Sequence, residues 1–163
     1  MLMSFVTRNA AKADLAPQEN KEAFIGQHLR DNGLGGGLMF NFKKKKMFRV
    51  IIAGGRDFND YEMLCDYCDK VLANITDEIV IISGAARGAD HLGMYYANDR
   101  GYKIQYFFPE WDKYGKSAGY RRNVQMAENA DALIAFWDGK SRGTNHMINI
   151  ANERGLKVRV KSY

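Results

Sequence analysis

The stretch that decides the fold runs from Phe48 to Phe58 and reads FRVIIAGGRDF. Phe48–Ala53 is a short run that is apolar except for Arg49, which is typical of a strand that is buried on both faces of a sheet. Gly54 and Gly55 follow directly and predict a tight turn into the next element. This order of apolar strand, turn and helix recurs along the rest of the chain.

After Phe58 comes a stretch with apolar residues at helical spacing, which begins at Tyr61. Four more apolar runs follow it. Expected strands cover 79–82, 103–108, 132–137 and 156–160, and expected helices cover 89–99, 118–128 and 144–153. Strands that alternate with helices indicate an α/β fold with a parallel sheet. The prediction is a Rossmann-like, doubly wound, mainly parallel five-stranded sheet with helices on both faces, most simply in the order 3-2-1-4-5.

The chain of 163 residues, with 46% hydrophobic and 26% charged residues, has the composition of a globular protein. No apolar run approaches the roughly 18–20 residues that cross a bilayer, and the N-terminus does not resemble a secretory signal. We therefore expect a cytoplasmic protein without a membrane partner. Residues 47–163 are predicted to form one domain, and residues 1–46 a basic, partly disordered appendage that is either a tail without function or an arm.

The net charge of +5 is concentrated in the appendage. Residues 1–46 hold eight Lys/Arg and four Asp/Glu, whereas residues 47–163 hold sixteen and fifteen. Lys43, Lys44, Lys45 and Lys46 account for most of the excess. Because the body is close to neutral, its charge does not favour nucleic acid as a partner.

Two cysteines form a C-x-x-C spacing, which is compatible with a redox pair or half of a zinc site. Cys65 and Cys68 lie on an i, i+3, i+4, i+7 apolar stripe that includes Tyr61, Leu64 and Val71. The stripe predicts an amphipathic helix with both thiols packed inward rather than reactive. His91 and His146 have no clustered carboxylate or cysteine, so we expect no metal site.

Three loops that follow strands are rich in glycine, arginine and small polar residues: 54–58, 83–90 and 137–144. In a doubly wound sheet these loops meet at the carboxyl ends of the strands. Glycine allows close backbone approach, helix N-termini favour anions, and arginine binds phosphate oxygens. None is a Walker loop or a G-x-G-x-x-G motif, so we expect no cofactor.

The residues expected to bind a phosphate-bearing ligand come from these loops and from the start of the helix over 118–128. They are Gly54, Gly55, Arg56, Asp57, Ser83, Gly84, Arg87, Gly88, Asp90, Arg122, Asn123, Trp137, Asp138, Ser141, Arg142, Gly143 and Thr144. Asp57 and Asp90 are either ligand contacts or helix caps, and Ser141 and Thr144 are open to the same two roles. Trp137 either packs over the site or covers the sheet.

The loop after the third strand, residues 108–117, interleaves aromatic rings with charged groups. Such a composition suits a flap over a planar base. The alternative is a surface loop that Trp111 and Tyr114 anchor to the core.

Four motifs resemble the SLOG superfamily, which joins the Smf/DprA and LOG proteins, and specifically its YspA/YpsA-related branch. The resemblance runs from about Phe48 to Val160, and the motifs read IAGGRDF, SGAARGAD, AGYRRN and WDGKSRGT. It implies a Rossmann-like fold and a nucleotide-derived ligand, without a settled activity. Relatives in this superfamily often associate through helices, so the resemblance is compatible with a homo-oligomer.

One departure from the resemblance concerns catalysis. LOG-type phosphoribohydrolases carry a P-G-G-x-G-T-x-x-E motif whose glutamate contributes to cleavage. Aligning Gly143 and Thr144 with that G-T places Met147 at the glutamate position. A thioether is no general base and stabilises no oxocarbenium ion. No catalytic residue is therefore assigned, although Asp57 and Asp138 are candidates for a substitute.

Three functions follow, in order of preference. The first is a module that senses, sequesters or presents a nucleotide derivative, such as an ADP-ribose-like or cyclic species. The second is a hydrolase or transferase that acts on an N-glycosidic or phosphate bond. The third is DprA-like binding of single-stranded DNA.

Overall fold

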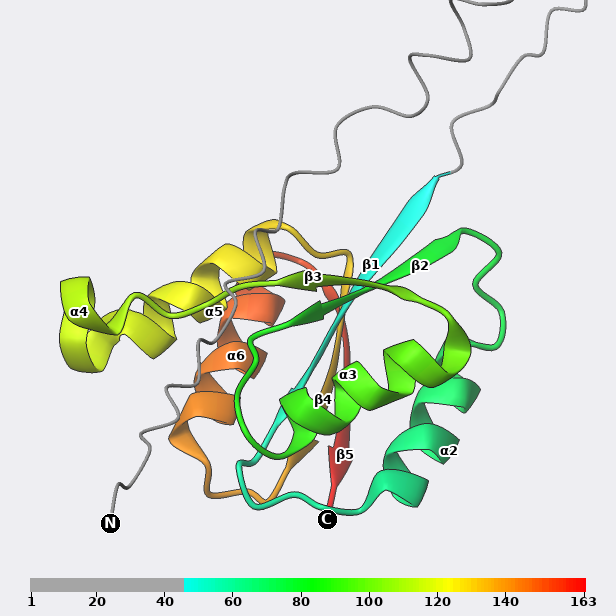
Figure 1. Ribbon diagram of the computed structural model, residues 1–163, viewed down its shortest axis with the longest axis horizontal. Coiled ribbons are helices and arrows are strands. Elements are labelled where there is room, and N and C mark those ends of the chain that lie inside the picture. The colour runs from blue at the N-terminus through cyan, green and yellow to red at the C-terminus, as the bar shows by residue number, and fades with distance from the viewer. Residues whose placement is uncertain (1–45) are drawn as a thin grey trace, which may run out of the picture. The chain divides into compact units, whose positions relative to one another are not determined.

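Residues 46–163 are those that the computed structural model describes, and within them five strands alternate with helices (Figure 1). The predicted appendage, residues 1–46, lies outside the described residues except for Lys46. The elements in chain order are β1 Met47–Gly54, α2 Tyr61–Leu72, β2 Glu78–Ser83, α3 Ala89–Arg100, β3 Lys103–Tyr106, α4 Trp111–Tyr114, η1 Gly115–Ser117, α5 Ala118–Glu128, β4 Ala132–Trp137, α6 Arg142–Glu153 and β5 Lys157–Ser162.

The five strands form one parallel sheet in the order β3-β2-β1-β4-β5, which confirms the predicted fold class and strand order. The order reverses at β1, because β2 lies on one side of it and β4 on the other. Ile51 is paired with Ile82 of β2 and with Leu133 of β4. A crevice is expected at such a switch point, at the carboxyl ends of the strands.

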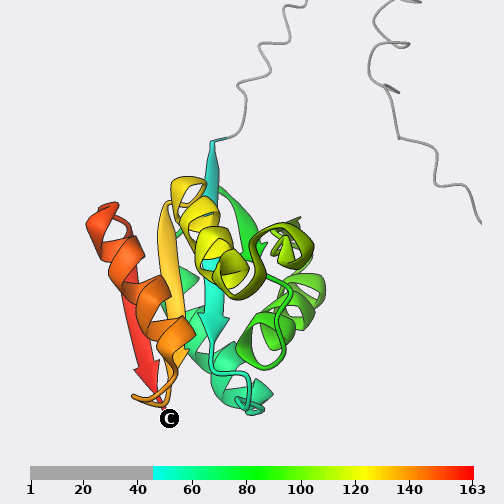
Figure 2. The same ribbon diagram turned by 90° about the vertical axis from the view of Figure 1, so that its left-hand side faces the viewer.

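Helices cover both faces of the sheet, and alternate residues of β1 point to opposite faces. Val50 and Ile52 join the core formed with α2 and α3, whereas Ile51 and Ala53 join the core formed with α5 and α6. In Figure 1 the sheet lies between these two helix pairs, and Figure 2 looks onto the face that α5 and α6 cover. Burial on both faces explains why residues 50–53 of β1 form a continuous apolar run instead of an alternating one.

The element boundaries differ from the expected ones at a few positions. α6 begins at Arg142, not Thr144, because the side chain of Ser141 is the N-cap and accepts a hydrogen bond from the Thr144 amide. β5 extends to Ser162, because the edge strand continues its pairing as far as Trp137. The segment expected to be only a loop after β3 contains α4 and η1.

The two cysteines differ in their environment. The Cys68 side chain is buried in the core beneath α2, as predicted, whereas Cys65 is only partly buried. Burial raises the pKa of the Cys68 thiol, so the thiolate is disfavoured. Within residues 46–163, no helix has the length and apolar character needed to cross a membrane.

Candidate functional site

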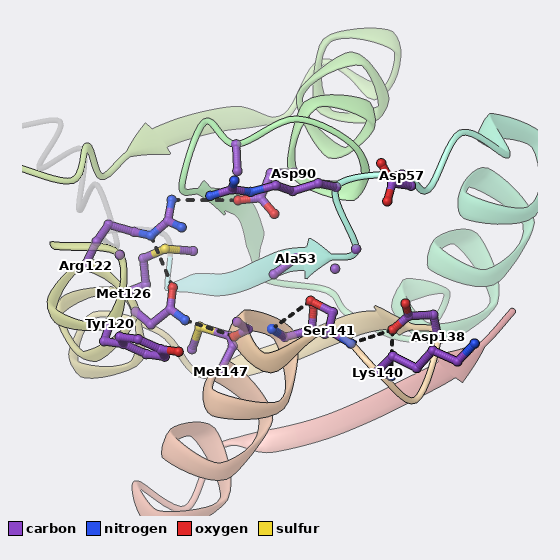
Figure 3. Close-up of a pocket in the computed structure, with 18 of the residues that line it drawn as sticks. Ala53, Asp57, Asp90, Tyr120, Arg122, Met126, Asp138, Lys140, Ser141 and Met147 are labelled. Atoms are coloured by element: carbon purple, nitrogen blue, oxygen red, sulfur yellow. Dashed lines mark hydrogen bonds and ion pairs between the residues drawn. The ribbon is translucent and has the colours of Figure 1, made fainter. Parts of the chain in front are cut away.

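A crevice of about 540 Å³ opens at the carboxyl end of β1, where the strand order reverses. Figure 3 shows it between the loops after β1 and β4 and the helices α5 and α6. The sequence-predicted residues that line it are Gly54, Gly55, Arg56, Asp57, Asp90, Arg122, Asn123, Asp138, Ser141, Gly143 and Thr144. Those that do not line it are Ser83, Gly84, Arg87, Gly88, Trp137 and Arg142.

Asp90 and Arg122 form an ion pair in the wall of the crevice. Their closest nitrogen and oxygen atoms are 3.9 Å apart, and the two side chains are 5% and 13% exposed, respectively. Burial raises the pKa of Asp90, while Arg122 and the backbone amides that face the carboxylate oppose the rise. Asp90 does not cap α3, because Gly88 occupies the N-cap position without a side-chain bond.

Most of the loop after β2 does not line the crevice. It supports the ion pair of Asp90 and Arg122 instead. The Ser83 hydroxyl accepts a hydrogen bond from the Ala85 amide at 3.1 Å. The Arg122 guanidinium donates to the Gly84 carbonyl, and a Cβ at Gly84 would lie 1.7 Å from that guanidinium. Gly84 is therefore required for the close approach of Arg122.

Asn123 joins α5 to the start of α6. Its side-chain oxygen accepts a hydrogen bond from Arg122 Nε at 3.1 Å, and its Nδ2 donates to the Gly143 carbonyl at 3.2 Å. Nδ2 also lies 3.4 Å from Nδ1 of His146, whose pKa is lowered by burial. The amide thus holds Arg122 in place relative to the N-terminus of α6.

The loop after β4 presents that N-terminus to the crevice. Asp138 accepts hydrogen bonds from the Ser141 and Lys140 amides at 2.8 and 2.9 Å, and these bonds hold its pKa below the usual range. Ser141 Oγ accepts from the Thr144 hydroxyl at 2.9 Å. The amides of Arg142 and Gly143 have no acceptor inside the helix, as in the first turn of any α-helix.

Trp137 and Arg142 lie beside this loop rather than in the crevice. The Trp137 indole donates to the Ser141 carbonyl at 3.2 Å and packs on the core beneath α6, so it fastens the loop. The Arg142 side chain is exposed at the first position of α6.

Several lining residues were not predicted. They are Ala53, Ala86, Trp111, Lys116, Gly119, Tyr120, Met126, Lys140, Met147 and Tyr163. Trp111 and Lys116 belong to the aromatic segment over 108–117 that we interpreted as a flap, and Tyr120 follows it. The composition of that segment was the signal in the sequence that pointed to these lining residues. Trp111 and Tyr120 are 51% and 43% exposed, which contradicts an anchor of Trp111 in the core. No local signal in the sequence points to Tyr163.

The charged groups that line the crevice differ between its two ends. Burial lowers the pKa of Arg122, the Asp90 charge raises it, and the positive charge of Arg56 lowers it again. Both arginines line the crevice. Near the other end, burial and the negative charges of Asp138 and Asp57 raise the pKa of Tyr163. In Figure 3, Arg122 lies on the opposite side of the crevice from Asp138 and Lys140.

The wall on the Arg122 side of the crevice also has an apolar part (Figure 3). Met126 and Met147 are each 1% exposed and lie beside Tyr120 (Figure 3). Met147 therefore packs inward at the position where the LOG-type motif has glutamate. Among residues 46–163, no three His, Cys, Asp or Glu side chains gather into a metal-binding group.

Comparison with known proteins identifies a family, a relative and a solved structure that this chain resembles. Residues 48–114 match the YspA, cpYpsA-related SLOG family. The Gene 61 protein of Mycobacterium phage D29 is 32% identical over 118 residues, which are 69% of this chain and 94% of that protein. The X-ray structure of TM1055 has the same fold, with a TM-score of 0.51 at 20% identity over 69% of this chain and 72% of that one.

Proposed function

This chain belongs to the YspA, cpYpsA-related SLOG family, and we propose that its crevice binds a nucleotide or a nucleotide-derived phosphate ligand. Family membership supports a role in binding or processing a nucleotide-related molecule. We propose binding, in order to sense, sequester or present the ligand, because the described crevice lacks a glutamate at the LOG-type position.

The observation that carries the proposal is the convergence of Arg56 and Arg122 on one cavity. Like charges repel, so two guanidinium groups that face one space favour an anion between them. Asp90 neutralises only Arg122 among the residues described, and Arg56 forms no ion pair with any of them. Phosphate suits this position, because guanidinium binds its oxygens in a bidentate manner.

The rest of the crevice suits the remaining parts of a nucleotide. The amides of the first turn of α6 offer further donors for phosphate oxygens. Tyr120, Met126 and Met147 offer an apolar wall on which a base or sugar ring packs. A volume of about 540 Å³ is within the range of small-molecule sites.

Thermal unfolding in the presence of AMP, GMP, CMP, UMP or ADP-ribose tests the proposal. A ligand at about 100 times its Kd stabilises the folded state by about 2.7 kcal/mol, which raises the Tm of a domain of this size by about 10 °C. We expect such a shift with at least one member of the panel. The expected location is tested with Arg56→Ala, an exposed position whose loss leaves the core intact.

Arg159→Ala is the matched control, because Arg159 is an exposed arginine on β5 that does not line the crevice. Arg56→Ala should lose the shift and keep the Tm of the unliganded protein, whereas Arg159→Ala should keep both. The proposal fails if no nucleotide shifts the wild-type Tm, or if the two variants respond alike.

A further inference from the structure

A second recess shares Arg56 and Asp57 with the crevice, and we call it the side recess. Its volume is about 350 Å³. Phe58 and Leu92 form its apolar floor, and Arg56, Arg87 and His91 form an exposed rim. The Phe58 ring is held in place, because it stacks on Phe136 with the ring centroids 4.8 Å apart.

The side recess adjoins the crevice because the loops after β1 and β2 touch. Gly88 has a φ of +78°, and a Cβ there would lie 2.1 Å from the Gly55 carbonyl oxygen. The Ala89 amide donates to the same oxygen at 3.3 Å. This contact brings the side chains of Arg56 and Arg87, from different loops, to one rim.

Arg56 and Asp57 line both cavities, so they form a shared wall. The two cavities are therefore neighbours on either side of these two residues. The wall is made of two exposed side chains and not of packed core, which leaves room for a ligand to cross it.

The charge on the rim is not neutralised within residues 46–163. No carboxylate there forms an ion pair with Arg56 or Arg87, and Asp57 is the single acidic residue that lines the recess. The His91 ring adds a polar group, with Nε2 at 3.1 Å from the Tyr95 hydroxyl. Because Arg56 and Asp57 are shared with the crevice, Arg87 is the arginine that the side recess adds, and its guanidinium suits a second phosphate.

We propose that the ligand is of the dinucleotide class, with one nucleotide half in the crevice and a second phosphate-bearing half in the side recess. The inference rests on the proposed function, which places the first half. Arg87 binds the second phosphate. The sequence predicts Arg87 to be a phosphate ligand, and this role is compatible with its position outside the crevice. The Phe58 and Leu92 floor packs against the sugar or base of this half.

Calorimetry with two probes tests this. The first is whichever of AMP, GMP, CMP and UMP binds best, and the second is the linear 5′-phosphorylated dinucleotide of the same base. Each is titrated into wild type, Arg87→Ala, His91→Ala and the control Arg159→Ala. The full chain is used throughout, and thermal unfolding without ligand verifies that each variant is folded.

We expect the dinucleotide to bind wild type at least about tenfold more tightly than the mononucleotide. Arg87→Ala should remove most of that ratio without changing mononucleotide affinity, His91→Ala should reduce it, and Arg159→Ala should preserve it. A dinucleotide that binds no more tightly than the mononucleotide, or a ratio that Arg87→Ala leaves unchanged, overturns the inference and leaves the proposed function standing. If neither probe binds wild type, this inference is overturned, and the proposed function then stands only if ADP-ribose shifts the Tm.

Discussion

Replacing Arg122 by methionine removes the positive charge that faces the buried carboxylate of Asp90. The closest atoms of the two groups are 3.9 Å apart, and the side chains are 13% and 5% exposed. Methionine keeps an unbranched, flexible stem that fills irregular space, but it loses the charge and the hydrogen bonds to the Gly84 carbonyl and the Asn123 side chain. Of these losses, the charge is the one that makes the effect depend on pH. The variant leaves a buried carboxylate without its cation.

Two unit charges at this separation attract by about 4 kcal/mol at an effective dielectric constant of about 20. Removing one partner of a buried ion pair typically costs about 3–5 kcal/mol, which agrees. With an unfolding entropy of about 2.1 cal/mol/K per residue, a loss of about 4 kcal/mol lowers the Tm of this domain by about 15 °C.

The destabilisation depends on pH with a defined sign. Burial raises the pKa of Asp90, and Arg122 opposes that rise, so Arg122→Met raises the pKa further. The carboxyl of the unfolded chain titrates near about 3.9. A group whose pKa is raised by folding contributes stability below its unfolded pKa and loses it as the pH rises through the folded pKa. The deficit of the variant should therefore grow from acidic to neutral pH.

Thermal unfolding followed by circular dichroism, at several pH values between about 5 and 8, measures this deficit relative to wild type. The matched control is the double variant Asp90→Asn with Arg122→Met, in which the pair has no ionisable group and the deficit should not grow with pH. A deficit below about 1 kcal/mol in Arg122→Met, or one that is the same at both ends of the pH range, refutes the reasoning.

Three further outcomes are expected. Gly88→Ala should lower the free energy of unfolding by at least about 2 kcal/mol, measured in urea, because the new Cβ meets backbone at a positive φ; a neutral effect would contradict the loop contact. Ser141→Ala should cost about 1 kcal/mol by the same measurement, since the Thr144 amide loses its cap; unchanged stability would show that the cap contributes nothing. Burial raises the pKa of Cys68, so a thiol reagent should modify only Cys65 in the native protein and both cysteines after unfolding; two thiols reacting at equal rates in the native state would exclude this packing.

Local sequence patterns were sufficient to predict the fold. The apolar run at 50–53 is buried on both faces, and such runs alternate with helices, which leaves few topologies other than the doubly wound sheet. The same patterns place the carboxyl ends of the strands, and with them the loops that line the crevice. Those features depend on residues that are adjacent in sequence.

The tertiary structure decided which of the loop side chains share a cavity. Arg87 and Arg122 look alike in the sequence, since each is an arginine near the start of a helix. Arg122 reaches the crevice because Gly84 leaves space for its guanidinium, whereas the contact of Gly88 with Gly55 directs Arg87 to the side recess. Tyr163 lines the crevice only because β5 pairs with β4. The direction of a side chain into a site depends on packing between segments distant in sequence, and no local pattern encodes that packing.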